Sequence, residues 1–383
     1  MKNLLMAASG LALLSGTAIA GGLDRTGQPI GIIFEEGTYA EFSFSHTRPS
    51  VSGNGLQTVT PVFPDGFEYG DVAKNFSNFG AGFKTDLNDK LSLSFIFEQP
   101  FGADILYGGD PATTELGGTS AVANTESYTA VLRYKFDENF SVHAGVRAQQ
   151  AGGQIDLRGT AYGPFGNPAG ANGYSVDLGN DFGFGYLVGV AYERPDIALR
   201  VALTYNSAIT HEFETNETFL GTAIGPQSIT ETDSPESLNL DFQTGVAKDT
   251  LVFGNIRYAK WSEFKIVPEV FGGSTPTGLV DLDDSTSYTL GVGRRFTDNW
   301  AGSVSYTYEE AQDPLVSPLA PTDGLRAITV AAIYTLDKVE FTTGIRYTQP
   351  GDATPEVGTP DTARANFTDN EAVTVGFKVG YNF

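Results

Sequence analysis

The sequence contains no cysteine, so the protein uses neither disulfide bonds nor thiol chemistry. It also lacks any uninterrupted apolar run of the roughly 18 residues that would indicate a membrane helix. Basic residues are scarce, with 23 Lys and Arg against 46 Asp and Glu, and the formal net charge is −23. Because so acidic a chain repels phosphates, this composition excludes nucleic acid as a partner.

Histidine is also rare, and the sequence gives little support for an enzyme. His46, His143 and His211 are widely separated and show no metal-ligand spacing. The acidic runs at 281–284 and 369–371 offer oxygen ligands to Ca²⁺, although such runs are more often solvated loop charge. We therefore expect no catalytic residue, no metal site and no cofactor.

The N-terminus has the pattern of a signal peptide. Lys2 precedes a short apolar stretch, Leu4 to Leu14, and Ala18-Ile19-Ala20 provides a small-x-small cleavage site. The apolar stretch is too short for a membrane helix, which needs roughly 20 residues. We predict that residues 1–20 are a signal peptide and that the protein is exported.

Glycine and aromatic residues are plentiful, with 46 Gly, 27 Phe and 17 Tyr. In about fourteen segments, bulky apolar residues alternate with small or polar ones, which is the period of a β-strand. The last segment, 371–383, alternates from Val373 to the terminal Phe383. The other thirteen lie at 38–47, 75–85, 90–98, 126–136, 140–148, 182–192, 197–205, 236–247, 250–262, 288–296, 300–308, 328–334 and 339–347. The pattern predicts an all-β protein.

The connections between these segments alternate between short and long. Short links such as 137–139, 248–249 and 297–299 separate long ones at about 48–74, 99–125, 150–180, 211–235, 266–284, 309–324 and 348–370. Tight turns at one end and long loops at the other are typical of a transmembrane β-barrel. Aromatic residues at strand ends fit its interfacial girdles. We predict a transmembrane antiparallel β-barrel of about 14 strands over residues 38–383.

Four segments and the C-terminus carry a family resemblance. They are DFGFGYLVGVAYE (181–193) followed by RVALTYNS (200–207), YAKWSEFK (258–265), DNWAGSVSYTYEE (298–310) and the final GYNF. In this order the chain resembles the FadL/TodX (OMPP1) family of Gram-negative outer-membrane transporters for hydrophobic compounds and long-chain fatty acids. The resemblance implies a monomeric fourteen-stranded barrel whose N-terminal segment plugs the lumen as a hatch.

The segment that precedes the first strand, 21–37, is the candidate for this hatch. It lacks strand alternation and includes Asp24, Arg25, Ile30, Ile32, Ile33 and Phe34. The Asn-Pro-Ala that many family members carry in the hatch occurs here only at 167–169, inside a long loop. We therefore predict a plug of some kind, shorter than the family's usual hatch.

Three long loops are unusually apolar and suggest a ligand site. They lie at 99–109, 161–174 and 265–273, and contain Phe101, Ile105, Leu106, Tyr107, Tyr162, Phe165, Val267 and Phe271. Because loops normally run through water, such clusters suggest a site for a hydrophobic ligand or a cap that faces the membrane. The alternative is that they pack against one another and against the rim of the barrel.

A fatty acid would also need a positive group for its carboxylate, because an unpaired charge is costly in an apolar pocket. By the resemblance, Arg158 lies where the family places an arginine that contacts the carboxylate. The alternatives are an ion pair with Asp156 or a contact with lipopolysaccharide phosphate. A second basic residue used by some members has no counterpart, since 268–293 contains neither Lys nor Arg. This leaves neutral hydrophobic ligands open.

The sequence thus predicts a passive outer-membrane transporter for hydrophobic compounds, with long-chain fatty acids as the expected ligands. The alternatives are a general diffusion porin and, less favoured, a barrel-borne hydrolase. Expected partners are a hydrophobic small molecule, outer-membrane lipid and lipopolysaccharide. The barrel-assembly machinery is expected to recognise Phe383.

Overall fold

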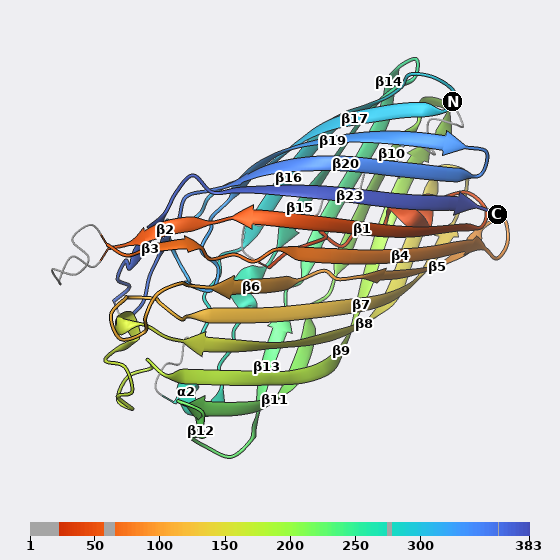
Figure 1. Cartoon of the computed structure of the whole chain (residues 1–383). Coiled ribbons are helices and arrows are strands. Elements are labelled where there is room, and N and C mark those ends of the chain that lie inside the picture. Colours follow the sequence, from red (N-terminus) through yellow and green to blue (C-terminus); the bar gives the residue numbers. More distant parts are fainter. Residues whose placement is uncertain (1–22, 57–65, 274–277, 359) are drawn as a thin grey trace.

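The computed structural model describes residues 23–56, 66–273, 278–358 and 360–383, so the predicted signal peptide lies outside the described residues. Over these residues the chain forms one closed antiparallel barrel of fourteen strands (Figure 1). The wall closes where β1 (Tyr39–Ser50) pairs with β23 (Glu371–Asn382) on one side and β4 (Phe76–Asp86) on the other. The predicted fold is confirmed.

The other wall strands follow one another around the barrel, and three of them are each broken into two pieces. The unbroken ones are β7 (Ser120–Lys135), β8 (Phe140–Leu157), β9 (Tyr174–Arg194), β15 (Thr250–Ala259), β16 (Ser285–Arg295), β17 (Trp300–Glu309), β19 (Leu325–Leu336) and β20 (Val339–Pro350). The broken ones are β5 (Leu91–Glu98) with β6 (Gly102–Leu106), β10 (Leu199–Asn206) with β11 (Ile209–Phe219), and β13 (Ser228–Ser234) with β14 (Ser237–Ala247).

The long loops gather at the end of the barrel opposite to the C-terminus, which we call the loop end (Figure 1). They contain the strands β2 (Ser52–Gly55), β3 (Glu68–Asp71), β12 (Thr222–Ala223), β18 (Leu315–Val316), β21 (Thr354–Pro355) and β22 (Ala365–Phe367). They also contain the short helices η3 (Thr160–Tyr162), η5 (Trp261–Glu263) and α2 (Glu269–Gly272). η4 (Pro195–Ile197) lies in a tight turn between β9 and β10. In the described part of the chain, no helix is long and apolar enough to cross a membrane.

The wall strands place apolar residues outside and polar residues inside, as their alternation predicts. On β23, Val375 is 50% exposed, whereas the neighbouring Thr374 is 1% exposed. Rings of aromatic residues flank this apolar band, as in outer-membrane barrels. Near the loop end, the hydroxyl groups of Tyr205 and Tyr258 donate to Glu236 and Asp284. At the opposite end, which we call the turn end, Phe140 packs against Tyr192 with ring centroids 4.8 Å apart.

Several strands are longer than the sequence analysis predicts. The expected loops at 150–180 and 211–235 contain the end of β8, the start of β9, and most of β11 and all of β13. The outward residues there are polar, for example Glu212 and Glu231, which face each other across β11 and β13. The strands therefore continue beyond the point where the apolar alternation stops. The alternation does not predict these extensions, because their outward residues are polar.

At each break in a strand, the positions that face the lumen change from even-numbered to odd-numbered residues or the reverse. Along β5 and β6, the buried residues change from Ser92, Ser94 and Glu98 to Phe101, Ala103 and Ile105. Along β10 and β11, they change from Thr204 and Asn206 to Ile209, His211 and Phe213. Each break therefore shifts the pattern by one residue, and beyond the first two breaks apolar residues such as Phe101, Ile209 and Phe213 face the lumen.

Candidate ligand-binding site

The N-terminal segment, residues 23–37, crosses the lumen and is bound to opposite parts of the wall. Its 3-10 helix η2 (Gly31–Phe34) follows an extended stretch. Arg257 of β15 donates from Nε to Asp24 at 2.8 Å, and the Thr26 hydroxyl donates to Glu98 of β5 at 2.6 Å. Ser237 of β14 donates to Gln28 at 2.9 Å. Charged and polar contacts therefore hold the segment between two sides of the barrel.

Apolar and cation–π contacts hold the other end of this segment. Ile30, Ile32 and Ile33 are 3%, 4% and 0% exposed. The Phe34 ring lies between two guanidinium groups, that of Arg133 at 4.5 Å and that of Arg200 at 4.4 Å from its centroid. A guanidinium over an aromatic face is attracted by the ring quadrupole, most strongly where water is excluded. Phe34 is thus fixed from both faces.

The segment also replaces a missing strand partner in the wall. β4 pairs with β5 only from Ala81 onward, so Phe76–Gly80 has no ladder partner on that side. The facing stretch between β5 and β6 instead bonds to the N-terminal segment. Arg25 N donates to Pro100 O at 2.7 Å, and Gly102 N donates to Leu23 O at 2.9 Å. We call this interruption between β4 and β5/β6 the seam.

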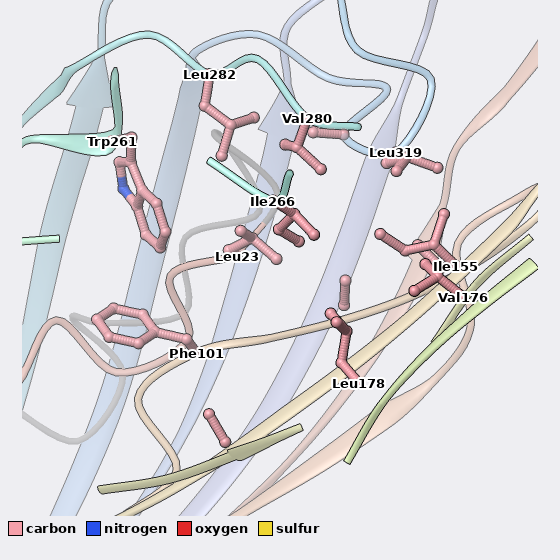
Figure 2. Packing of buried hydrophobic residues seen from close by; sticks show 14 of the residues in the cluster. Leu23, Phe101, Ile155, Val176, Leu178, Trp261, Ile266, Val280, Leu282 and Leu319 are labelled. Atoms are coloured by element: carbon pink, nitrogen blue, oxygen red, sulfur yellow. The ribbon is translucent and has the colours of Figure 1, made fainter. Parts of the chain in front are cut away.

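An apolar cavity of about 90 Å³ lies between the N-terminal segment and the loops. Figure 2 shows its packing, with side chains from the N-terminal segment, the wall and the loops around a common space. Leu23 comes from the segment, and Ile155 and Leu178 come from β8 and β9. The loops contribute Ile266, Val280, Leu282, Leu319 and Ala320. No Lys or Arg is among the described residues that line it.

Aromatic rings form one side of this cavity. Trp261, in η5 directly after β15, is 1% exposed and meets Phe101 edge-on at 5.2 Å between ring centroids. Phe264 packs against Trp261 at 5.9 Å. On the far side His211 stacks on Phe213 at 5.5 Å, and its Nε2 lies 3.1 Å from Gln149 Oε1. The cavity is thus apolar, with a few polar groups at its edge.

The structure brings together only some of the predicted ligand residues. Phe101 lines the cavity, and Tyr162 and Phe271 pack against the surrounding cluster. Ile105 and Tyr107 belong to a second apolar cluster under the loops. Leu106, Phe165 and Val267 are exposed by 43%, 49% and 38%. The pattern of the sequence did not reveal Leu282, Leu319 or Ala320, because these residues meet only through the folding of distant loops.

Tyr107 illustrates how the second cluster packs. Its hydroxyl donates to Pro318 O at 2.8 Å, and its ring meets Phe367 at 5.8 Å. Burial raises the pKa of Tyr107 well above its ordinary value. This side chain therefore joins two loops and stays neutral.

Arg158 is bound by the neighbouring ends of β8 and β9. Its guanidinium donates to Leu157 O, Tyr174 O and Ser175 Oγ, and pairs with Asp156 at 3.0 Å. It does not line the apolar cavity. The pair with Asp156 is the alternative that the sequence analysis left open, and a ligand role for Arg158 stays a prediction.

The candidate metal and catalytic residues remain apart. In the described ranges, no group of three or more His, Asp or Glu is placed to hold a metal ion. Asp284 accepts hydrogen bonds from Tyr258 and from Ser262 N. His46 lies beside Ser77, and His143 beside Thr204, on different strands.

A second cavity, of about 120 Å³, lies at the seam. Its inner lining includes Asn78 and Ile96, whereas Phe79 and Phe97 come from the outward face of the same strands. Residues from both faces of one wall line a common space only where the wall is open. The seam is therefore a place at which the lumen approaches the lipid.

Comparison with known sequences identifies the group of proteins. The family described as "Outer membrane protein transport protein (OMPP1/FadL/TodX)" matches residues 68–316, more than half of the chain. The chain belongs to this family. Its members are Gram-negative outer-membrane transport channels for hydrophobic compounds rather than enzymes, and the predicted location and family are confirmed. Among curated proteins, no sequence matches significantly.

Solved structures agree in fold. A Pseudomonas aeruginosa FadL homologue has a TM-score of 0.71 at 14% identity, with 96% of this chain and 97% of that one covered. The Pseudomonas putida toluene transporter TodX has a TM-score of 0.63 at 13% identity, covering 97% and 96%. The Ralstonia pickettii toluene transporter TbuX has 0.62 at 13%, covering 91% and 90%. At these identities the likeness establishes the barrel fold alone.

Proposed function

We propose that the protein is a passive uptake channel in which a hydrophobic compound binds in the apolar cavity under the loops. The observation that carries this proposal is the cavity itself, enclosed by apolar side chains from the wall, the loops and the N-terminal segment. Apolar pockets with few polar groups are typical binding sites for small hydrophobic molecules.

We further propose that long-chain fatty acids and neutral hydrocarbons both enter this cavity with their apolar parts. TodX and TbuX are toluene transporters, which supports neutral hydrocarbons, and fatty acids are what the resemblance of the sequence to the FadL/TodX family implies. The absence of Lys and Arg from the described lining supports an apolar guest at this position. An acidic head group would have to lie elsewhere in the lumen.

The N-terminal segment is proposed to act as the hatch of the channel, and the seam as its exit. Since Leu23 lines the cavity and Arg25 bonds to Pro100 at the seam, a shift of one segment affects both. A compound that leaves through the seam enters lipid directly and never crosses water. We propose that the loop end faces outward, that the protein acts as a monomer, and that Phe383 is read during assembly.

A cavity-filling substitution tests the proposal. Ala121 of β7 is 6% exposed and lines the cavity, so Ala121→Leu places three additional carbon atoms in it. Ala332→Leu, on β19 next to the lipid-facing Val330, is the matched control. We expect Ala121→Leu to slow uptake of toluene and dodecanoate into proteoliposomes, and Ala332→Leu to leave it unchanged.

Liposome swelling separates this proposal from the porin alternative. With the segment in place, small sugars should permeate slowly. Rapid sugar permeation through the wild-type protein, together with equal hydrocarbon uptake by both variants, would support a general diffusion porin instead.

A further inference from the structure

The seam cavity contains a buried cation that lacks an anionic partner. Arg25 is 9% exposed, and among the described residues its Nε has no hydrogen-bond acceptor. Its guanidinium makes a cation–π contact with Phe76, with 4.4 Å between the guanidinium carbon and the ring centroid. In the described part of the chain, no carboxylate lies within ion-pair distance of Arg25, and Asp104 acts on it only through the longer-range field.

The other charged groups in this cavity already have partners. Lys378 lies 3.1 Å from Glu41, and Glu98 lies 3.6 Å from Arg147. Glu98 also accepts the Thr26 hydroxyl. Among the described charged residues that line this cavity, Arg25 is therefore the one without an ion-pair partner. Burying a guanidinium without such a partner is costly.

A second polar side chain in the same cavity is also unsatisfied. Asn78 of β4 is 6% exposed, and neither its Nδ2 nor its Oδ1 has a hydrogen-bond partner in the part of the chain that the structure describes. It lies in the stretch of β4 that lacks a partner strand at the seam. Leaving a buried amide without partners is costly, and a ligand or water at this position would offset that cost.

We propose that Arg25 and Asn78 bind the carboxylate of a hydrophobic acid as it passes through the seam. A guanidinium fork donates two parallel hydrogen bonds to a carboxylate, and an amide nitrogen can donate a third. The outward-facing Phe79 and Phe97 line the same cavity and would contact the apolar body. This inference rests on the proposed function. It names the class of compound that would leave through the seam, namely hydrophobic carboxylic acids, either fatty acids or aromatic acids.

Local packing keeps the guanidinium at this position. A Cβ at position 102 would fall 2.3 Å from the Arg25 guanidinium carbon, so glycine is needed there for the arginine to fit. Arg25 also lines a further cavity, whose other lining residues include Gly102 and Asp104. The arginine thus borders both this cavity and the seam cavity.

The test is binding of radiolabelled dodecanoate and of its methyl ester to the purified full chain in detergent. In Arg25→Gln we expect a roughly tenfold or greater loss of dodecanoate affinity, as for a lost charged hydrogen bond, with ester affinity unchanged. Arg25→Lys should recover part of the loss, and Asn78→Leu should show a smaller loss. Arg294→Gln, which removes an exposed guanidinium, is the charge-matched control. A parallel series with benzoate and toluene distinguishes aromatic acids from fatty acids as the source of the carboxylate.

The outcomes separate the two proposals. If Arg25→Gln weakens binding of the acid and of the ester equally, or changes neither, the carboxylate site is refuted. Arg25 and Asn78 then contact only water. If the wild-type protein binds neither the ester nor toluene, the proposed function itself fails. Heat-dependent mobility of each variant on gels confirms that its barrel is folded.

Discussion

Replacing Phe34 by leucine should release the N-terminal segment from the wall. The substitution keeps an apolar side chain but removes the ring that lies between Arg133 and Arg200. Arg133 is 3% exposed, whereas Arg200 is half-buried. A cation–π contact contributes about 2 kcal/mol when desolvated and about 0.5–1 kcal/mol when exposed, so the two together contribute about 2.5–3 kcal/mol.

That loss should raise the population of the detached segment roughly 60- to 140-fold, since each 1.4 kcal/mol is a factor of ten. Hydrogen exchange followed by mass spectrometry measures it directly, as faster exchange in peptides that cover residues 23–37. Single-channel recording should show more frequent opening. Phe184→Leu is the matched control, because Phe184 is 76% exposed on the outer face of β9.

If residues 23–37 exchange at the wild-type rate while the barrel remains folded, Phe34 does not hold the segment to the wall. Faster exchange throughout the barrel would instead mean that Phe34 supports the fold as a whole. Phe34→Tyr keeps the aromatic face and should behave like the wild type.

Three further predictions concern other parts of the molecule. Gly380→Ala should lower the unfolding temperature, because its Cβ would fall 2.1 Å from the Tyr39 hydroxyl; Gly31→Ala, whose Cβ meets nothing within 4 Å, is the control. Burial, followed by the nearby Asp361, raises the pKa of Glu356 to about 7. The folded loop therefore favours the protonated form and should resist proteolysis better at pH 6 than at pH 8, a difference that Glu356→Gln should abolish. Arg158→Gln should speed proteolysis between Leu157 and Tyr174, whose carbonyls it binds, without changing the preference for dodecanoate over its ester; a lost preference would restore Arg158 as the carboxylate ligand.

The barrel was predictable because the membrane imposes a two-residue period on each strand. All fourteen predicted segments correspond to wall strands, including the weak one at 75–85, which is β4. The extensions of β9 and β11 were missed for the same physical reason. Above the lipid their outer residues include Asp177 and Glu214, so no apolar period continues there.

The site was less predictable because its residues come from many separate segments. The apolar loops correctly suggested buried clusters, and Phe101 lies in the cavity. Trp261 stands out in the sequence only as part of a family motif, although it is among the most buried side chains of the site. In the sequence Arg25 is one of several residues of the predicted hatch. That it lacks a carboxylate partner among the described residues is visible only in three dimensions.

The seam is stabilised by particular residues rather than left as a defect in the barrel. Pro100 has no N–H, so the stretch that contains it cannot complete a ladder with β4. The Phe79 N–H, which a neighbouring strand would otherwise bind, donates instead to the Gln99 side chain at 2.9 Å. The remaining backbone groups, Pro100 O and Gly102 N, bond to the N-terminal segment. If that segment leaves, these two groups lose their partners, and Pro100, which has no N–H, cannot help to complete a ladder with β4. In the proposed channel, release of the segment would therefore leave the seam without its backbone partners rather than close the wall.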